Sequence, residues 1–195
     1  MIATTAPHQY FWRRGASIIV GDVPPTQFDL SPECLGWAQL ARYRWDVAAA
    51  VLRRPGEPGY GFRGAPGGRV EMIELVDDGP GERILYAADA TVMECFVFTV
   101  VGDDVRDDLD LPYLEFPSGP ADIAPHYHLG EGVNGSRTLF RRDSPVAATP
   151  GDHANLSALV PLSHCLGYSL DELKQSFLHQ GGAPLLRGGR YAPRK

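Results

Sequence analysis

The stretch 59–89, GYGFRGAPGGRVEMIELVDDGPGERILYAAD, holds three short segments of strand character separated by turns rich in glycine and proline. The segments are GYGFRG, GGRVEMIELV and ERILYAAD, and the middle one places its side chains alternately, though imperfectly, on two faces. The connections PGGR and DDGPGE are typical of hairpins. Successive short strands joined in this way favour an antiparallel meander over a parallel sheet.

A helix start precedes this meander. Ser31 suits the N-cap position, Pro32 the first helical position and Glu33 the positive end of the helix dipole. The apolar spacing that follows predicts a helix as far as about Arg54, where Pro55 and a glycine would stop it.

Two further helix starts follow the meander. Asp89 is a candidate N-cap for a helix that passes Gly102 and ends before Pro112, although the valine, threonine and phenylalanine in this segment also suit a buried strand. Later, residues 169–172 (SLDE) form a capping box at the start of a helix that continues to Gly181.

The remaining segments complete the expected elements. Residues 10–22 read as a strand, and residues 112–135 read mainly as a loop because proline, glycine and histidine are dense there. Residues 136–149 predict a short hairpin, and residues 156–166 form an apolar helical stretch interrupted by Pro161.

The sequence therefore predicts an α+β fold, an antiparallel β-sheet meander with helices packed against it. We expect a flexible N-terminal segment over 1–8 and a single domain over 9–195. The three cysteines, Cys34, Cys95 and Cys165, lie far apart among apolar neighbours, which indicates free buried thiols rather than disulfides or a zinc site.

Composition excludes several classes of function. The net charge of −6 disfavours nucleic acid as a partner, since binding to phosphates requires clustered lysine and arginine. No apolar run approaches the length that spans a bilayer, and the N-terminus lacks the pattern of a secretory signal. We therefore expect a soluble cytoplasmic protein with no membrane partner.

The stretch APHYHLGEG, residues 124–132, is the strongest candidate for a metal site. A cupin-like enzyme would bind its metal through His126, His128, Glu131 and a further histidine, His153. However, the carboxylate and the third histidine are each one residue short of the cupin spacing, and a one-residue shift in a strand turns a side chain to the opposite face. A surface loop with no bound cofactor is the preferred interpretation, and the cupin enzyme is an alternative.

Other chemistry has less support. Adjacent Ser163, His164 and Cys165 do not place a base against a nucleophile, and neither a nucleophile elbow nor a P-loop is present, so no catalytic residue is assigned. Residues 156–178 resemble a helix-turn-helix, which makes a DNA-binding regulator a further alternative. Its second helix presents Asp171 and its neighbour Glu172 near the N-terminus, where they would repel phosphates.

The acidic run GDDVRDDLD, residues 102–110, is the strongest charge feature. Its spacing does not match a calcium loop. The run is either a solvated helix end or a docking patch with a markedly negative potential.

The segments GYGFRG, VEMIELV, ILYAADATVMECFVFTVVGDDVRDDLDLPYL and SLDELKQSFLHQGGAPLL resemble an actinobacterial immunity protein family. That family includes the antitoxin of the tuberculosis necrotizing toxin, which hydrolyses NAD. The resemblance extends from about Trp37 to Tyr191. It implies an immunity protein without enzymatic activity, which binds a toxin domain one-to-one and blocks its NAD pocket before export.

The partner is therefore expected to be a protein, the cognate toxin domain. A stable inhibitory interface buries roughly 1,200–2,000 Å² and is anchored by aromatic or arginine side chains. We expect the anchors among aromatic residues on surface loops and in the acidic run. The candidate contact residues are Tyr60, Phe62, Tyr113, Asp103, Asp104, Asp107 and Asp108.

Overall fold

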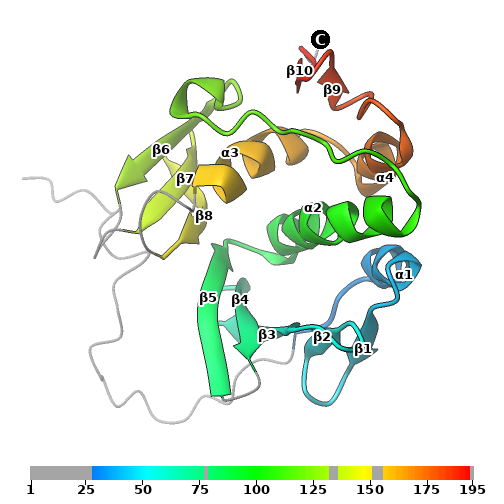
Figure 1. Cartoon of the computed structure of the whole chain (residues 1–195). Coiled ribbons are helices and arrows are strands. Elements are labelled where there is room, and N and C mark those ends of the chain that lie inside the picture. The colour runs from blue at the N-terminus through cyan, green and yellow to red at the C-terminus, as the bar shows by residue number, and fades with distance from the viewer. Residues whose placement is uncertain (1–27, 77–78, 132–135, 151–155, 194–195) are drawn as a thin grey trace, which may run out of the picture.

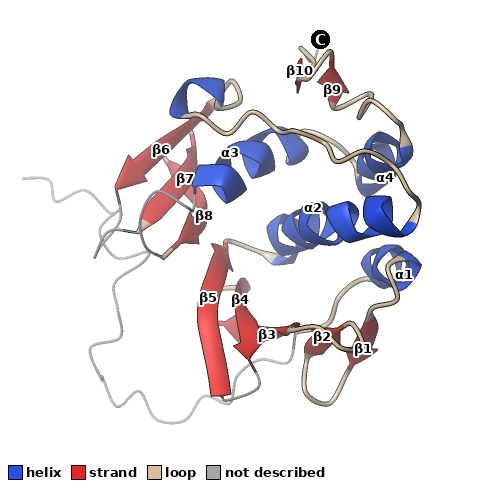
Figure 2. Cartoon of the chain, viewed as in Figure 1, coloured by secondary structure: helices blue, strands red, loops and turns tan. Residues whose placement is uncertain are grey.

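The protein is built on one eight-stranded antiparallel sheet with helices packed against it (Figures 1 and 2). The strand order is β1-β2-β3-β4-β5-β8-β7-β6, and every neighbouring pair is antiparallel. This architecture confirms the predicted α+β class. The structure, a computed structural model, describes residues 28–76, 79–131, 136–150 and 156–193.

The first five strands form an antiparallel meander. They are β1 (Arg44–Asp46), β2 (Val51–Arg53), β3 (Gly59–Ala65), β4 (Arg69–Val76) and β5 (Gly79–Ala87). Strands β3 to β5 are the predicted part, while β1 and β2 lie in the segment predicted as a helix. Gly67 and Gly68 turn the chain between β3 and β4 with φ angles of 80° and 77°, a backbone region that favours glycine. The hairpin expected there from PGGR is confirmed.

The other three strands of the sheet form a second antiparallel unit. They are β6 (Tyr127–Glu131), β7 (Arg137–Arg141) and β8 (Ser144–Thr149), and β7 and β8 confirm the predicted hairpin. The two units join where β5 pairs with β8 at only two positions, Tyr86 with Ala148 and Ala87 with Ala147. A separate pair, β9 (Leu186–Arg187) and β10 (Arg190–Tyr191), closes the chain.

The helix α2 (Ala90–Asp108) runs through the middle of the molecule. Helices α1 (Pro32–Leu40) and α4 (Leu170–Leu178) lie on either side of its C-terminal half, and α3 (Leu156–Cys165) packs beside the β6–β8 unit (Figure 1). Helix α2 therefore contacts the three other helices and the first part of the sheet, at β4 and β5.

All three helix starts expected from the sequence are confirmed. Ser31 Oγ accepts the Cys34 amide at 3.2 Å, and Asp89 Oδ1 accepts the Val92 amide at 2.9 Å. Ser169 and Glu172 form the reciprocal capping box. These side chains satisfy amides that have no partner within the helix.

Aromatic packing joins α1, α2 and α4. Trp37 stacks on Phe98 with ring centroids 5.1 Å apart, and its indole donates to the Phe98 carbonyl at 3.1 Å. Phe177 of α4 completes the cluster 6.1 Å from Trp37 and is fully buried. The three thiols are free and buried, as predicted.

The predicted helix over residues 32–54 is wrong beyond Leu40. The chain reverses at Arg42, whose φ is 62°, and then forms β1 and β2. The reversal places Trp45 against Phe62 at 5.6 Å, while the Asp46 carboxylate accepts two amides of the alanine run and shapes the β1–β2 turn. Packing of these aromatic side chains on the sheet outweighs the helix propensity of the alanines.

The predicted loop over residues 112–135 is also wrong in part, because β6 forms within it and pairs with β7 along its whole length. Helix α4 ends at Leu178, three residues before Gly181. The strand expected over 10–22 and the segment 1–8 lie outside the described residues.

Candidate partner-binding surface

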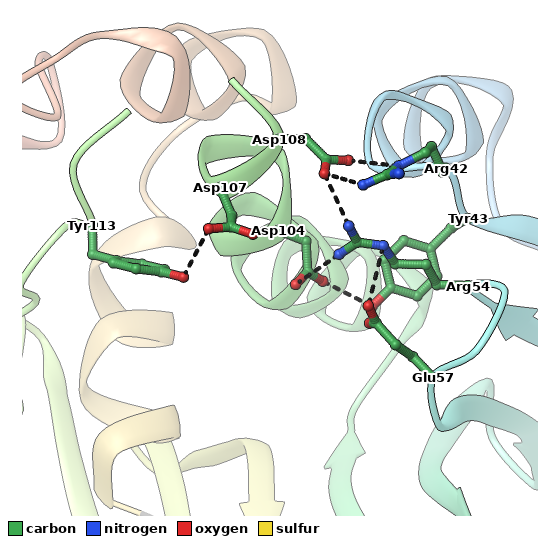
Figure 3. A network of polar contacts seen from close by, with 8 residues as sticks. All are labelled: Arg42, Tyr43, Arg54, Glu57, Asp104, Asp107, Asp108 and Tyr113. Atoms are coloured by element: carbon green, nitrogen blue, oxygen red, sulfur yellow. Dashed lines mark hydrogen bonds and ion pairs between the residues drawn. The ribbon is translucent and has the colours of Figure 1, made fainter. Parts of the chain in front are cut away.

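The acidic run occupies the last turns of α2, and helical spacing divides it between two faces. Asp104 and Asp108 are one turn apart and lie on the face toward Arg42 and Arg54. Asp107 lies on the other face, toward Tyr113 (Figure 3). The run is therefore not one uniform patch.

The first face is held by internal cations. Arg54, which is 8% exposed, pairs with Asp108 at 2.9 Å and with Asp104 at 3.4 Å. Arg42 binds Asp108 through two nitrogens, and the Tyr43 hydroxyl donates to Asp104 at 2.8 Å. These contacts connect α2 to the chain on both sides of β1 and β2, so Asp104 and Asp108 have a structural role within the chain (Figure 3).

The ion pairs at Asp108 predict a dependence of stability on pH. The hydrogen bond from Arg42 and the charge of Arg54 lower the pKa of Asp108 below its ordinary value of 3.8, although partial desolvation opposes them. Because the folded-state pKa is the lower one, this contribution is complete above the ordinary value and is lost as the pH falls through the folded-state pKa. We expect wild-type protein to be more stable than Asp108→Asn at pH 6, with the difference shrinking towards pH 3.

Urea denaturation of both proteins at these two pH values measures the difference. Asp110→Asn, which removes an exposed carboxylate of the same run, is the matched control for the loss of one negative charge. A stability difference between wild type and Asp108→Asn that is equal at pH 6 and pH 3 would contradict the assigned ion pairs.

The second face is open. Asp103 and Asp107 are exposed, and Tyr113, at 66%, is the most exposed large hydrophobic residue among those described. The Tyr113 hydroxyl lies 3.3 Å from Asp107 Oδ1. Of the seven predicted contact residues, these three are exposed and form no ion pair within the described part of the chain, although the charge of Arg106 acts on Asp103.

The aromatic residues of β3 differ from the expectation. Tyr60 and Phe62 lie in a strand rather than on a loop, and Phe62 is buried at 4% exposure between Phe28 and Trp45. Tyr60 is partly buried beside Tyr43. Phe62 therefore belongs to the core, and little of its ring is accessible at the surface.

Arg106 was missed as an important residue. It lies within the acidic run yet is fully buried, and its guanidinium donates to the carbonyls of Pro112, Phe177, His179 and Gln180. Desolvation lowers its pKa, which the charge of Asp103 partly offsets. Arg106 thereby caps the C-terminal end of α4 and fixes the loop that follows α2.

The histidine-rich stretch forms an edge strand, not the expected loop. His128 stacks on Phe140 at 5.1 Å, and Glu131 pairs with Arg137 at 3.2 Å across β6 and β7. Within the described residues, no group of three or more histidine, cysteine or acidic side chains could hold a metal ion. His153 of the cupin alternative lies outside them.

The structure also argues against the helix-turn-helix alternative, because one face of α4 is packed inside the protein. Leu173, Ser176 and Phe177 of α4 are buried, and the helix packs on α2. The pair α3–α4 is thus part of the core. No helix in the described chain is long and apolar enough to cross a membrane.

Most of the chain matches one protein family. The family model of immunity protein 61 matches residues 37–185, which include the central helix, the acidic run and most of the sheet. The chain belongs to the immunity protein 61 family.

Relatives of this immunity protein support the assignment. The immunity factor for TNT of Mycobacterium tuberculosis H37Rv and its homolog in Mycobacterium bovis BCG are each 34% identical over 103 residues. The alignment covers 51% of this chain and 56% of each relative, so it spans about half of their length.

The fold agrees with a solved relative as well. The structure of Rv3902c from M. tuberculosis matches with a TM-score of 0.72 and 25% identity, and the match covers 83% of this chain and 96% of that one. An immunity protein family contains inhibitors of toxins rather than enzymes. The resemblance inferred from the sequence and the expected absence of catalytic function are therefore both confirmed by the family.

Proposed function

We propose that this immunity protein neutralises an NAD-hydrolysing toxin domain by binding it one-to-one and covering its NAD pocket. The observation that carries the proposal is the 34% identity to an immunity factor for TNT, within a family match that spans residues 37–185. Because the toxin would be neutralised before export, binding takes place in the cytoplasm of the producing cell.

The structure suits occlusion by a preformed surface. Helix α2 and its flanking helices share a fully buried aromatic core, and Arg106 fixes the loop that carries Tyr113. A surface that is ordered before binding loses little conformational entropy in the complex. Tight inhibition therefore requires no folding step in this part of the chain.

The test uses the purified chain and the purified NAD-hydrolysing toxin domain that is its proposed partner. We expect NAD hydrolysis to fall linearly with added protein and to stop at about one equivalent, which isothermal titration calorimetry should confirm as a one-to-one complex. If the NAD pocket is covered, raising the NAD concentration should increase the apparent inhibition constant. Hydrolysis that continues unchanged with excess protein would refute the proposal.

A further inference from the structure

Three of the six exposed large hydrophobic residues in the described chain gather at one end of the helical layer. They are Leu109 at 53%, Tyr113 at 66% and Leu178 at 39% exposure. Leu109 and Tyr113 follow α2 directly, while Leu178 is the last residue of α4. Single exposed apolar side chains need no explanation, but several on neighbouring segments are typical of an interaction site.

Arg106 holds these segments together. Its guanidinium donates to the carbonyl of Pro112, beside Tyr113, and to that of Phe177, beside Leu178. The Leu111 amide also bonds back to the Arg106 carbonyl at 2.9 Å. The backbone beside Tyr113 and Leu178 is therefore held in place by the same buried arginine. A rigid backbone reduces the entropy lost when such residues bind a partner.

The rim of this surface is acidic. Asp103, Asp107, Asp110 and Glu115 are exposed, and the one cation within residues 103–115 is Arg106, whose side chain is buried. Arg42 and Arg54 bind the opposite face of α2 (Figure 3). On this side the buried Arg106 offsets part of the Asp103 charge. Exposed Lys174 lies one turn before Leu178, so four carboxylates face two cations. An apolar centre with a negative rim selects a partner with a positive rim.

We propose that the face formed by Leu109, Tyr113 and Leu178, with its rim of Asp103, Asp107 and Asp110, docks onto the cationic rim of the toxin's NAD pocket. This inference rests on the proposed function. NAD carries two phosphate charges, so a pocket that binds it presents cationic or N–H donors to them. Carboxylates at the rim of the inhibitor would meet the same donors, while Tyr113 fills the apolar centre.

A second exposed surface, between α1 and β1, carries positive charge. A shallow groove between α1 and β1 is lined by Arg42, Arg44, Trp45 and Val47. Its arginines would repel the donors of a pocket that binds phosphates. This groove therefore supplies the matched control for the docking experiment.

The experiment measures binding of the same toxin domain to variants of each surface. We expect Tyr113→Ala to raise Kd roughly 30-fold, the loss typical of an anchor residue at an interface centre. Asp107→Lys should slow association roughly tenfold and reduce its dependence on salt. The groove variants Val47→Ser and Arg44→Glu should bind as wild type does, and unchanged melting temperatures show that each variant is folded.

The outcomes separate this inference from the proposed function. Wild-type inhibition with unaltered binding by Tyr113→Ala and Asp107→Lys would overturn the docking face alone, as would loss of binding in the groove variants only. If wild-type protein itself fails to inhibit, the proposed function falls and the docking face with it.

Discussion

Replacing Arg106 with alanine is expected to lower the free energy of unfolding by ~3–5 kcal/mol. The change leaves the carbonyls of Pro112, Phe177, His179 and Gln180 without their donor. Hydrogen bonds to a charged group contribute about 1.5–3 kcal/mol each, and the cost of burying the guanidinium offsets part of their sum. Equilibrium denaturation in urea, monitored by circular dichroism, measures the loss.

Two further variants show whether the hydrogen bonds cause the effect. Arg106→Lys keeps the positive charge, but one ammonium cannot reach all the carbonyls that lie around the edge of the planar guanidinium, so we expect an intermediate loss. Arg187→Ala removes an exposed arginine of the C-terminal strand β9 and should have little effect. An Arg106→Ala protein as stable as wild type would show that the four carbonyls find water or other donors.

Local patterns were sufficient to predict the helix starts and the hairpins. Capping by Ser31, Asp89 and Ser169 depends on a side chain and an amide three residues away, so the sequence contains the whole interaction. The β3–β4 hairpin likewise depends on two adjacent glycines. These elements could be read with no knowledge of the rest of the chain.

The errors occur where distant contacts decide the local structure. Residues 41–54 have helical spacing, yet Trp45 packs on Phe62 and Leu52 is fully buried in β2. Residues 127–131 contain histidine and glycine, yet they form an edge strand because β7 offers a pairing partner. Neither partner can be identified from the segment itself, since strand propensity depends on tertiary context.

In the candidate surface, too, some features follow from the local sequence and others from distant contacts. The acidic run is visible in the sequence, but the assignment of Asp104 and Asp108 to internal ion pairs requires the positions of Arg42 and Arg54, which lie about fifty or more residues earlier. One local signal was available for Arg106. It follows Gly102 by one helical turn on the face that meets α4, so an arginine there lies beside a close helix contact.

That close contact gives the second large effect. Gly102 of α2 lies against the ring of Phe177, and a Cβ at this position would be under 3.0 Å from three ring carbons. The ring cannot move aside easily, because its centroid lies 6.1 Å from that of Trp37 and 5.9 Å from that of Phe116. We expect Gly102→Val to lower the free energy of unfolding by about 3 kcal/mol, at the upper end of typical overpacking costs.

A double-mutant cycle identifies the cause of this loss. Phe177→Leu shortens the opposing side chain, so the valine has room and fills part of the vacated space. The double variant should therefore be more stable than the sum of the two single changes predicts, by about 1 kcal/mol or more. If the losses in free energy of unfolding simply add, the cost of Gly102→Val arises in the helix backbone. If the double variant loses less than their sum, the cost arises at the contact between α2 and α4. The same contact positions Leu178 and the loop of Tyr113, so Gly102→Val should also weaken binding at the proposed docking face although its side chain is buried.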